Sequence, residues 1–248
     1  MEEKRRIMLV VAYDGTAYCG WQIQKNAITI EEKLNQALSE LTKEDIAVIG
    51  ASRTDSGVHA LGNVAVFDTS VRMPAEKFSY ALNQRLPEDI RIKKSMEVAS
   101  DFHPRKCETR KTYKYRIVNA QFPDPTRRLY AHFTYVPLDV MAMKEAGSYL
   151  EGEHDFKSFC SAGSQAETTV RNIYTLDVTS DKDEIIIEIT GNGFLYNMVR
   201  IIAGTLIEVG RGNMEPIEVM DILNAKDRAA AGPTAPACGL TLVGYDFV

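Results

Sequence analysis

A polar segment, Ser52-Arg53-Thr54-Asp55-Ser56-Gly57-Val58-His59-Ala60, lies between two apolar stretches of the sequence. Loops fixed by rigid strands are favoured positions for functional side chains. The residues alone leave three interpretations of Asp55 open: a turn in which it bonds its own backbone before Gly57, a catalytic carboxylate, or a metal pair with His59. The metal pair is the weakest, because the four histidines show no two-ligand spacing such as H-x-x-x-H.

A second polar position interrupts an apolar stretch near the end of the chain. After the small residues Gly191-Asn192-Gly193, the segment 194–209 is apolar and predicts a helix that contains Arg200. An isolated buried charge is costly, so a buried Arg200 needs a carboxylate partner such as Asp55. The alternative is a surface arginine whose aliphatic part alone is buried.

Positive charge is concentrated in one segment. The 248 residues carry 29 Lys and Arg against 34 Asp and Glu, a formal net charge of -5. Residues 104–128 carry eight Lys or Arg against Glu108 and Asp124, which makes this segment +6 and the remainder -11. Tyr113 and Tyr115 lie between the cations of this basic segment. A basic strip with interspersed aromatic residues is typical of a surface that binds phosphates. A solvated charged strand would show the same composition.

Several classes of protein are disfavoured by missing motifs. The sequence has no G-x-x-x-x-G-K-S/T loop, no complete dinucleotide fingerprint and no G-x-S-x-G elbow. Its four cysteines are scattered without a C-x-x-C pair, so neither a zinc site nor a disulfide framework is indicated. No apolar window is long enough for a membrane span, and the first residues do not resemble a signal peptide, so we expect a cytoplasmic protein.

These residues need a scaffold, and the hydrophobic pattern supplies two similar ones. The first half predicts a strand, helix, two strands, helix and strand at 7–13, 29–41, 46–52, 64–67, 74–83 and 90–98. Thr29 and Glu32 form a capping box at the first helix. The second half predicts the same order at 109–118, 138–150, 170–178, 184–190, 194–209 and 240–247, with a short extra helix at 217–223.

Repetition of this order predicts an α+β protein. Two ferredoxin-like (β-α-β-β-α-β) halves, residues 1–103 and 104–248, are expected to form a mainly antiparallel sheet with helices on one side. The first half carries the Asp55 loop, and the second carries the basic aromatic strand and the Arg200 helix.

Spaced blocks along nearly the whole chain resemble the tRNA pseudouridine synthase A family. The blocks are Tyr13-Asp14-Gly15, Gly20-Trp21-Gln22, Arg53-Thr54-Asp55-Ser56-Gly57-Val58-His59-Ala60, Ala81-Leu82-Asn83, Leu86-Pro87, Lys111-Thr112-Tyr113, His154-Asp155-Phe156 and Gly191-Asn192-Gly193-Phe194 through Met198-Val199-Arg200. Departures are small: Ser52 and Ser56 stand where the family often has glycine and alanine, and His103-Pro104 where it often has His-Ala.

The resemblance implies the pseudouridine synthase fold and isomerisation of uridine to pseudouridine at positions 38, 39 and 40 in the anticodon stem-loop of tRNA. It implies no cofactor and no metal, a homodimer, and one tRNA that touches both subunits. No membrane partner is expected, because the sequence has no apolar window long enough for a membrane span.

The resemblance also assigns roles. Asp55 would be the catalytic carboxylate, Arg200 its cationic partner, and Tyr113 the residue on which the target base stacks. Arg53 would fill the space left by the flipped base. Among the cations of the basic segment, Arg110 and Lys111 are expected to contact the RNA backbone, because they neighbour Tyr113 in the sequence. His59 is expected to be structural, and Trp21 and Gln22 are left as either packing or RNA-facing residues.

A non-catalytic tRNA-binding module is the alternative function, since the basic segment and the two halves would serve it equally. Asp55 discriminates between the two functions, because pure binding gains nothing from a carboxylate in an RNA-facing loop. Hydrolysis by a metal held between Asp55 and His59 is a third and weaker hypothesis.

Overall fold

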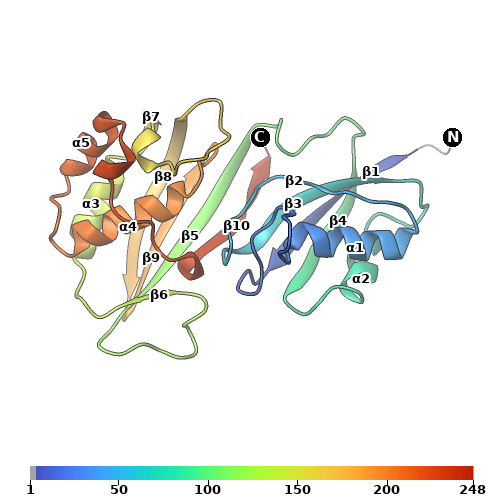
Figure 1. Ribbon diagram of the computed structural model, residues 1–248, viewed down its shortest axis with the longest axis horizontal. Coiled ribbons are helices and arrows are strands. Elements are labelled where there is room, and N and C mark those ends of the chain that lie inside the picture. The colour runs from blue at the N-terminus through green and yellow to red at the C-terminus, as the bar shows by residue number, and fades with distance from the viewer. Residues whose placement is uncertain (1–3, 248) are drawn as a thin grey trace. The chain divides into compact units, whose positions relative to one another are not determined.

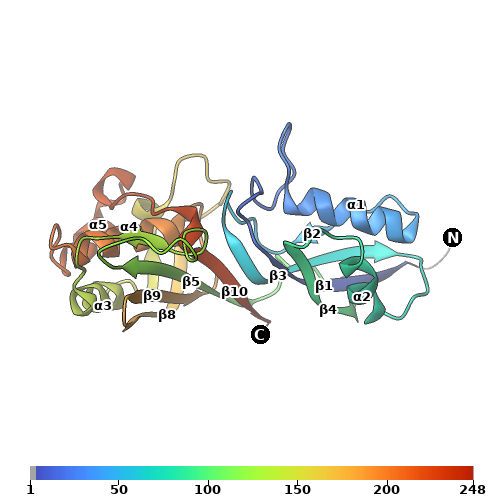
Figure 2. The same ribbon diagram turned by 90° about the horizontal axis from the view of Figure 1, so that it is seen from below.

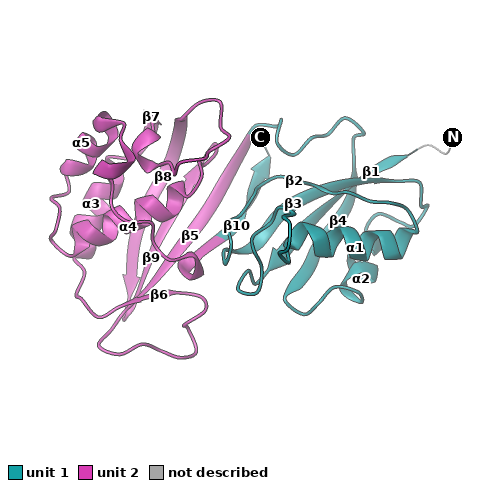
Figure 3. Cartoon of the chain, viewed as in Figure 1, with its two compact units in different colours: residues 1–108, 242–248 teal, residues 109–241 magenta. Residues whose placement is uncertain are grey.

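The structure is a computed structural model that describes residues 4–247, so the expectation about the first three residues lies outside the described part. Its helices and strands give the predicted α+β class (Figure 1). Two compact units divide the chain: unit 1 holds residues 1–108 and 242–248, and unit 2 holds residues 109–241 (Figure 3). Across residues 4–247, every helix is too short or too polar to cross a lipid bilayer.

Unit 1 follows the predicted β-α-β-β-α-β order. Its elements are β1 (Arg5–Tyr13), α1 (Ile30–Thr42), β2 (Ile49–Gly50), β3 (His59–Thr69), α2 (Lys77–Asn83) and β4 (Ile90–Val98). β1 lies between β4 and β3, antiparallel to both, and β2 pairs with the outer edge of β3. This strand order, 4-1-3-2 within the unit, is that of a ferredoxin-like fold. Figure 2 shows α1 along one face of the sheet.

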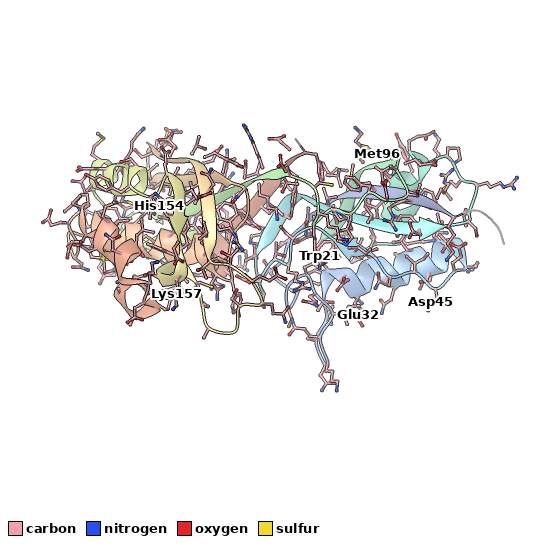
Figure 4. The ribbon with its side chains drawn as sticks, turned by 90° about the horizontal axis from the view of Figure 1, so that it is seen from above. Trp21, Glu32, Asp45, Met96, His154 and Lys157 are labelled. Carbon is pink, nitrogen blue, oxygen red and sulfur yellow. The ribbon has the colours of Figure 1, made fainter. Side chains whose placement is uncertain are left out.

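Alternation along β1 and β3 gives unit 1 two apolar faces. Leu9 and its neighbours on the helix side are fully buried, and Phe67 of β3 packs edge-on against Phe78 of α2. On the other face Met8 and Val66 belong to a second cluster, which the partly buried Met96 joins. Figure 4 shows Met96 on the opposite side of this sheet from Glu32 of α1. Buried apolar surface on both faces makes this sheet a rigid support for its loops.

Unit 2 repeats the element order with additions. Its elements are β5 (Thr109–Asn119), β6 (His132–Thr134), α3 (Val140–Ser148), β7 (Gly152–Asp155), β8 (Val170–Asp181), β9 (Glu184–Gly191), α4 (Met198–Gly210), α5 (Glu218–Ala225) and the first residues of β10 (Leu240–Phe247). β5, β9, β8 and β7 are antiparallel neighbours in that order, whereas β6 pairs parallel to β5.

Small residues let the helices of unit 2 pack closely. A Cβ at Gly147 of α3 would meet Leu176 of β8 at 2.5 Å, and one at Gly210 of α4 would meet Met143 of α3 at 2.8 Å. The buried side of β9 is a row of isoleucines at every second position, as expected for a strand with one covered face.

The division of the chain differs from the expected boundary between residues 103 and 104. Arg105 donates from Nε to the carbonyl of Gly50 at 2.7 Å, which ties residues 104–108 to unit 1. The last strand also crosses the division: residues 242–247 lie in unit 1, where Val243 approaches Gly62 of β3. Unit 1 is therefore completed by residues from beyond the predicted boundary, whereas unit 2 lies entirely within the predicted second half.

Candidate active-site loop and RNA-facing strand

The segment that carries Asp55 is a short loop between β2 and β3. The backbone N–H of Val58 donates to the carbonyl of Asp55 at 3.1 Å, and Gly57 takes a left-handed φ of 76°. This closes a tight turn directly after the carboxylate. The Asp55 side chain is half-buried, while Arg53, two residues earlier, is exposed. His59 and Ala60, predicted as loop, are already the first residues of β3.

Hydrogen bonds from the end of β1 and from the connection between β1 and α1 hold this loop. Trp21 donates its backbone N–H to the carbonyl of Thr54 at 3.0 Å, and the Thr54 hydroxyl shares a 2.7 Å hydrogen bond with the Tyr13 hydroxyl. Gly57 N–H and Ser56 Oγ both donate to the carbonyl of Tyr18. The position of Asp55 is therefore set by hydrogen bonds to the residue before it and to the two residues after it in the loop.

Tyr18 is itself fixed at its far end. Its hydroxyl donates to Asp89 Oδ1 at 2.6 Å. Burial, followed by this hydrogen bond, raises the pKa of the Tyr18 hydroxyl above its usual value, so the tyrosine stays neutral and keeps donating.

Two glycines allow the backbones to approach this closely. A Cβ at Gly20 would lie 2.6 Å from the carbonyl oxygen of Thr54, and Gly20 also has a left-handed φ of 82°. A Cβ at Gly15 would lie 2.0 Å from the carbonyl oxygen of Val58. The upstream glycines of the recognised blocks thus have a physical reason: a larger residue would displace the Asp55 loop.

The structure resolves the two alternatives left for Trp21 and Gln22. Trp21 is fully buried, lies near the start of α1 and faces Gly50, where a Cβ would collide with its ring (Figure 4). Gln22, the next residue, is exposed. Trp21 is therefore a packing residue, and Gln22 remains available to solvent.

His59 has a structural environment, as its assignment anticipated. Its side chain is 5% exposed, and Nδ1 lies 3.1 Å from both the backbone N of Gly15 and Oδ1 of Asp14. These contacts hold the first residues of the connection that follows β1. No group of three or more His, Cys, Asp or Glu side chains suited to a metal occurs in residues 4–247.

Positive charge lies beside the Asp55 loop. The pKa of Arg105 is lowered mainly by its partial burial. The positive charge of Arg53 lowers it further, so the two guanidiniums lie close to each other. Two guanidiniums next to one loop form a surface suited to an anion.

Tyr113 lies on β5, with Ile189 of β9 opposite. Its side chain is 8% exposed and packs edge-on against Phe194, with ring centroids 5.2 Å apart. The Phe194 contact fixes the plane of the Tyr113 ring. A ring whose plane is held by a neighbour loses little freedom when a base stacks on it.

The pleat of β5 divides the basic segment between two faces. Lys111 shares the face of Tyr113, because side chains alternate along a strand. Arg110, Lys114 and Arg116 lie on the opposite face. There Arg110 stacks on the Tyr174 ring at 5.0 Å, and Lys114 pairs with Glu188 of β9 at 2.8 Å. Adjacency to Tyr113 in sequence therefore gives Lys111 a place beside it, but not Arg110.

Arg200 lies in the first turn of α4, earlier in its helix than predicted. Its Nε donates to the carbonyl of Ala235 at 2.8 Å, and its Nη1 donates to Asn197 Oδ1 at 2.8 Å. Asn197 has a left-handed φ of 60°, and its Nδ2 donates to Ser161 Oγ at 3.0 Å. These bonds fix the orientation of the guanidinium. Asn197 was not among the predicted site residues.

Two more residues that order the Asp55 loop were missed. Asn63 of β3 donates from Nδ2 to the carbonyl of Ser52 at 3.1 Å and to the Tyr13 hydroxyl at 3.2 Å. Tyr245 of β10 donates to Ser52 Oγ and, at 3.4 Å, to Asn63 Oδ1. Asn63 could have been noticed in the sequence, because it is a polar residue within the apolar run of β3. The structure shows that it is fully buried.

Asp55, Tyr113 and Arg200 thus each have an ordered local environment, Asp55 in unit 1 and the other two in unit 2. A half-buried carboxylate on a braced loop can act as a nucleophile or base if it is ionised. A braced aromatic ring and a braced guanidinium can bind a base and an anion.

Comparison with known proteins gives one consistent result. The family model described as tRNA pseudouridine synthase matches residues 9–105 and 146–247. Similar proteins named tRNA pseudouridine synthase A include those of Thermoanaerobacter sp. (strain X514), 52% identical, and Ruminiclostridium cellulolyticum, 50% identical. Each alignment covers 96% of this chain and 98% of the relative. A chain of the archaeal box H/ACA sRNP Nop10-Cbf5 complex matches at a TM-score of 0.32 and 9% identity, over 95% of this chain and 46% of that chain, too weakly to add to the fold assignment.

Proposed function

This chain belongs to the tRNA pseudouridine synthase family, and we propose that it isomerises uridines 38, 39 and 40 of the tRNA anticodon stem-loop with Asp55 as its catalytic carboxylate. The observation that carries this proposal is the Asp55 loop. Its carbonyls and hydroxyls are bonded to Tyr13, Tyr18 and Trp21, yet the carboxylate itself remains partly accessible.

The reaction needs one carboxylate and no external reagent. The N1–C1′ bond of uridine breaks, the uracil rotates, C5 bonds to C1′, and the proton on C5 is lost while N1 gains one. Asp55 can attack C1′, attack C6 of the uracil, or remove the 2′ proton to give a glycal. All three routes require an ionised Asp55 and leave the substrate's atoms unchanged in number.

We assign Tyr113 two tasks: to stack on the flipped uracil and to accept the proton from C5. Stacking on an aromatic ring is worth about 1–3 kcal/mol, which is comparable with the few kcal/mol that unstacking a nucleotide costs. The edge-on contact with Phe194 supports this assignment, since it fixes the ring before the base arrives.

Arg200 and Arg53 are assigned as the cations of the reaction. We propose that Arg200 keeps the Asp55 carboxylate ionised, because a nearby guanidinium favours the charged form of a carboxyl group and so lowers its pKa. Arg53, exposed in the Asp55 loop, is proposed to occupy the space of the flipped base and to contact phosphate. Lys111 is the proposed backbone contact beside Tyr113, and Arg110 one on the other face of β5.

The resemblance also leads us to propose a cytoplasmic homodimer in which one tRNA touches both subunits. The chain is well suited to an RNA partner, since its cations are concentrated in residues 104–128 while the rest of the chain is acidic.

Mapping of pseudouridine in tRNA tests the proposal. The purified protein is incubated with tRNA transcripts that carry uridine singly at position 38, 39 or 40, and pseudouridine is located by carbodiimide-dependent stops of reverse transcription. We expect a stop at each of the three positions and none in a transcript with cytidine at all three. Modification elsewhere would refute the assigned positions, and tight binding without modification would favour the non-catalytic module.

A further inference from the structure

A basic depression lies in unit 1, away from the Asp55 loop. It has a volume of about 470 Å³. Its charged lining consists of four cations, Lys4, Arg5, Arg6 and Arg72, and one carboxylate, Glu97. Two more carboxylates bond to lining residues, Asp68 to Arg6 and Glu44 to Ser70, so cations still outnumber carboxylates here on a chain whose overall charge is negative. A local reversal of charge of this kind indicates a site for an anion.

Two of the four cations are already held by the protein. Arg6 makes a two-pronged bond to Asp68, with both distances 2.7 Å, and donates to the carbonyl of Phe102. Arg5 donates to the carbonyl of Met73 at 2.5 Å and lies 3.5 Å from Glu97. These bonds build the wall of the depression and fix its shape.

The other two cations, Lys4 and Arg72, are not held in this way, although the Lys4 charge contributes to the lowered pKa of Glu44 and of Asp68. Within residues 4–247, neither a hydrogen bond nor a close ion pair engages the side chain of Lys4 or Arg72. The Nε of Arg5 is shielded from solvent and has no acceptor in the same part of the chain. A buried donor without a partner is costly, so an acceptor supplied by a ligand would be stabilising here.

We propose that this depression binds a phosphate group. Arginine donors match the oxygens of a phosphate, and lysine adds a mobile point charge. The chemistry fits a phosphodiester of an RNA backbone or a free phosphate ion. RNA is the source that we favour, and this part of the inference rests on the proposed function.

The position of the depression determines what such a contact can do. Arg5 pairs with Thr69, whereas Tyr13, which contacts the Asp55 loop, pairs with Ala60 at the other end of β1. Arg5 and Tyr13 are the first and last residues of the nine-residue strand β1, so the eight steps between them span about 26 Å. A phosphate bound here belongs to RNA remote from the reacting uridine, so it contributes to affinity and not to the chemical step.

The test compares two double variants that remove the same charge. K4A/R72A removes the two cations of the depression that make no hydrogen bond within residues 4–247, and the control K93A/K94A removes two exposed lysines of β4 that do not line it. Affinity is measured for full-length tRNA and for an isolated anticodon stem-loop at several salt concentrations. Inorganic phosphate is titrated in parallel by NMR, and turnover is measured at saturating tRNA.

We expect K4A/R72A to weaken tRNA binding on the order of threefold to tenfold, to reduce the salt slope by about one, and to leave turnover unchanged. The control should change affinity less. Loss of the inorganic phosphate response alone would support the site with free phosphate as its ligand.

Equal RNA affinities and equal phosphate responses of the two variants would overturn the proposal. Because affinity is measured without turnover, this result is independent of whether the protein forms pseudouridine. Absence of modification by the wild-type protein would count against the proposed function only.

Discussion

At the scale of single residues, Asn197 combines two properties that matter for Arg200. Its φ of 60° is a conformation that asparagine tolerates, and its amide oxygen accepts a hydrogen bond from the Arg200 guanidinium. We infer that Asn197 is a positioning residue for Arg200. N197A is expected to lower turnover about tenfold with little change in KM, because the guanidinium loses one of its fixed bonds.

Two further variants separate this role from backbone strain. N197G relieves the left-handed conformation, so it should recover stability but not turnover. N197D keeps an oxygen toward Arg200 and should recover turnover. Steady-state kinetics and thermal unfolding of the three variants provide the comparison, and normal turnover of N197G would refute the positioning role.

Candidate site residues and the residues that support them stand out in the sequence to different degrees. Asp55 and Arg200 could be singled out because a charged residue within or between apolar runs is recognisable from the sequence alone. Asn63 and Tyr245 support the Asp55 loop from positions 11 and 193 residues away from Ser52, and no local pattern encodes such contacts. The different faces of Arg110 and Lys111 followed from the strand period and could have been predicted.

At the scale of elements, the connection between β1 and α1 has to approach the Asp55 loop very closely. G20A would place a Cβ 2.6 Å from the Thr54 carbonyl oxygen and would strain a φ of 82°. We expect a loss of stability of about 1–3 kcal/mol and a fall in turnover, because the loop must move. Denaturant unfolding and turnover measure the two effects.

Gly212 provides the matched control, since its φ is 74° and a Cβ there meets no atom within 4 Å. G212A therefore carries the same conformational cost without a collision. If G20A and G212A were equally stable and equally active, the close approach at Gly20 would not position the loop.

The pleat of β5 predicts unequal effects of neighbouring lysines. Lys111 shares the face of Tyr113, whereas Lys114 lies on the other face and is paired with Glu188. K111A should weaken tRNA affinity and reduce its salt slope by about one, and K114A should do so less. Equal losses in a binding assay at several salt concentrations would show that the face of the strand does not matter.

Element positions were predicted well where the hydrophobic period was long. β4 and β10 have the predicted bounds, and α1 begins after Thr29, whose Oγ1 accepts from Glu32 N–H as a cap. β2 is only Ile49–Gly50, shorter than the predicted 46–52, because only these residues pair with β3. β6 and β7 were missed, since three or four residues show no period and depend on pairing with β5 and β8.

At the scale of the whole molecule, the C-terminal strand packs into unit 1, which is otherwise formed by the N-terminal residues. Leu242 is fully buried, Phe247 packs edge-on against Phe102, and Tyr245 bonds to Ser52, all within unit 1. A chain truncated after Thr241 should unfold at least about 4 °C lower than the full chain, because it loses buried apolar area. Y245F, which removes only a hydroxyl, should lower the midpoint less. An unchanged midpoint for the truncated chain would show that β10 does not complete unit 1.

The net charge of -5 is an average over unlike surfaces. Cations are concentrated in residues 104–128 and in the depression beside Arg5, whereas acidic residues dominate elsewhere. Global charge was therefore a poor predictor of an RNA substrate, and the distribution of charge was a better one.

The most direct test of the account is the single substitution D55N, which keeps the size of the side chain and removes its charge. Turnover of tRNA uridine is expected to fall on the order of a thousandfold or more. Affinity for tRNA should be equal or tighter, because a negative charge near phosphates is lost. Pseudouridine formation by D55N at the wild-type rate would contradict the assignment of Asp55 as the catalytic carboxylate.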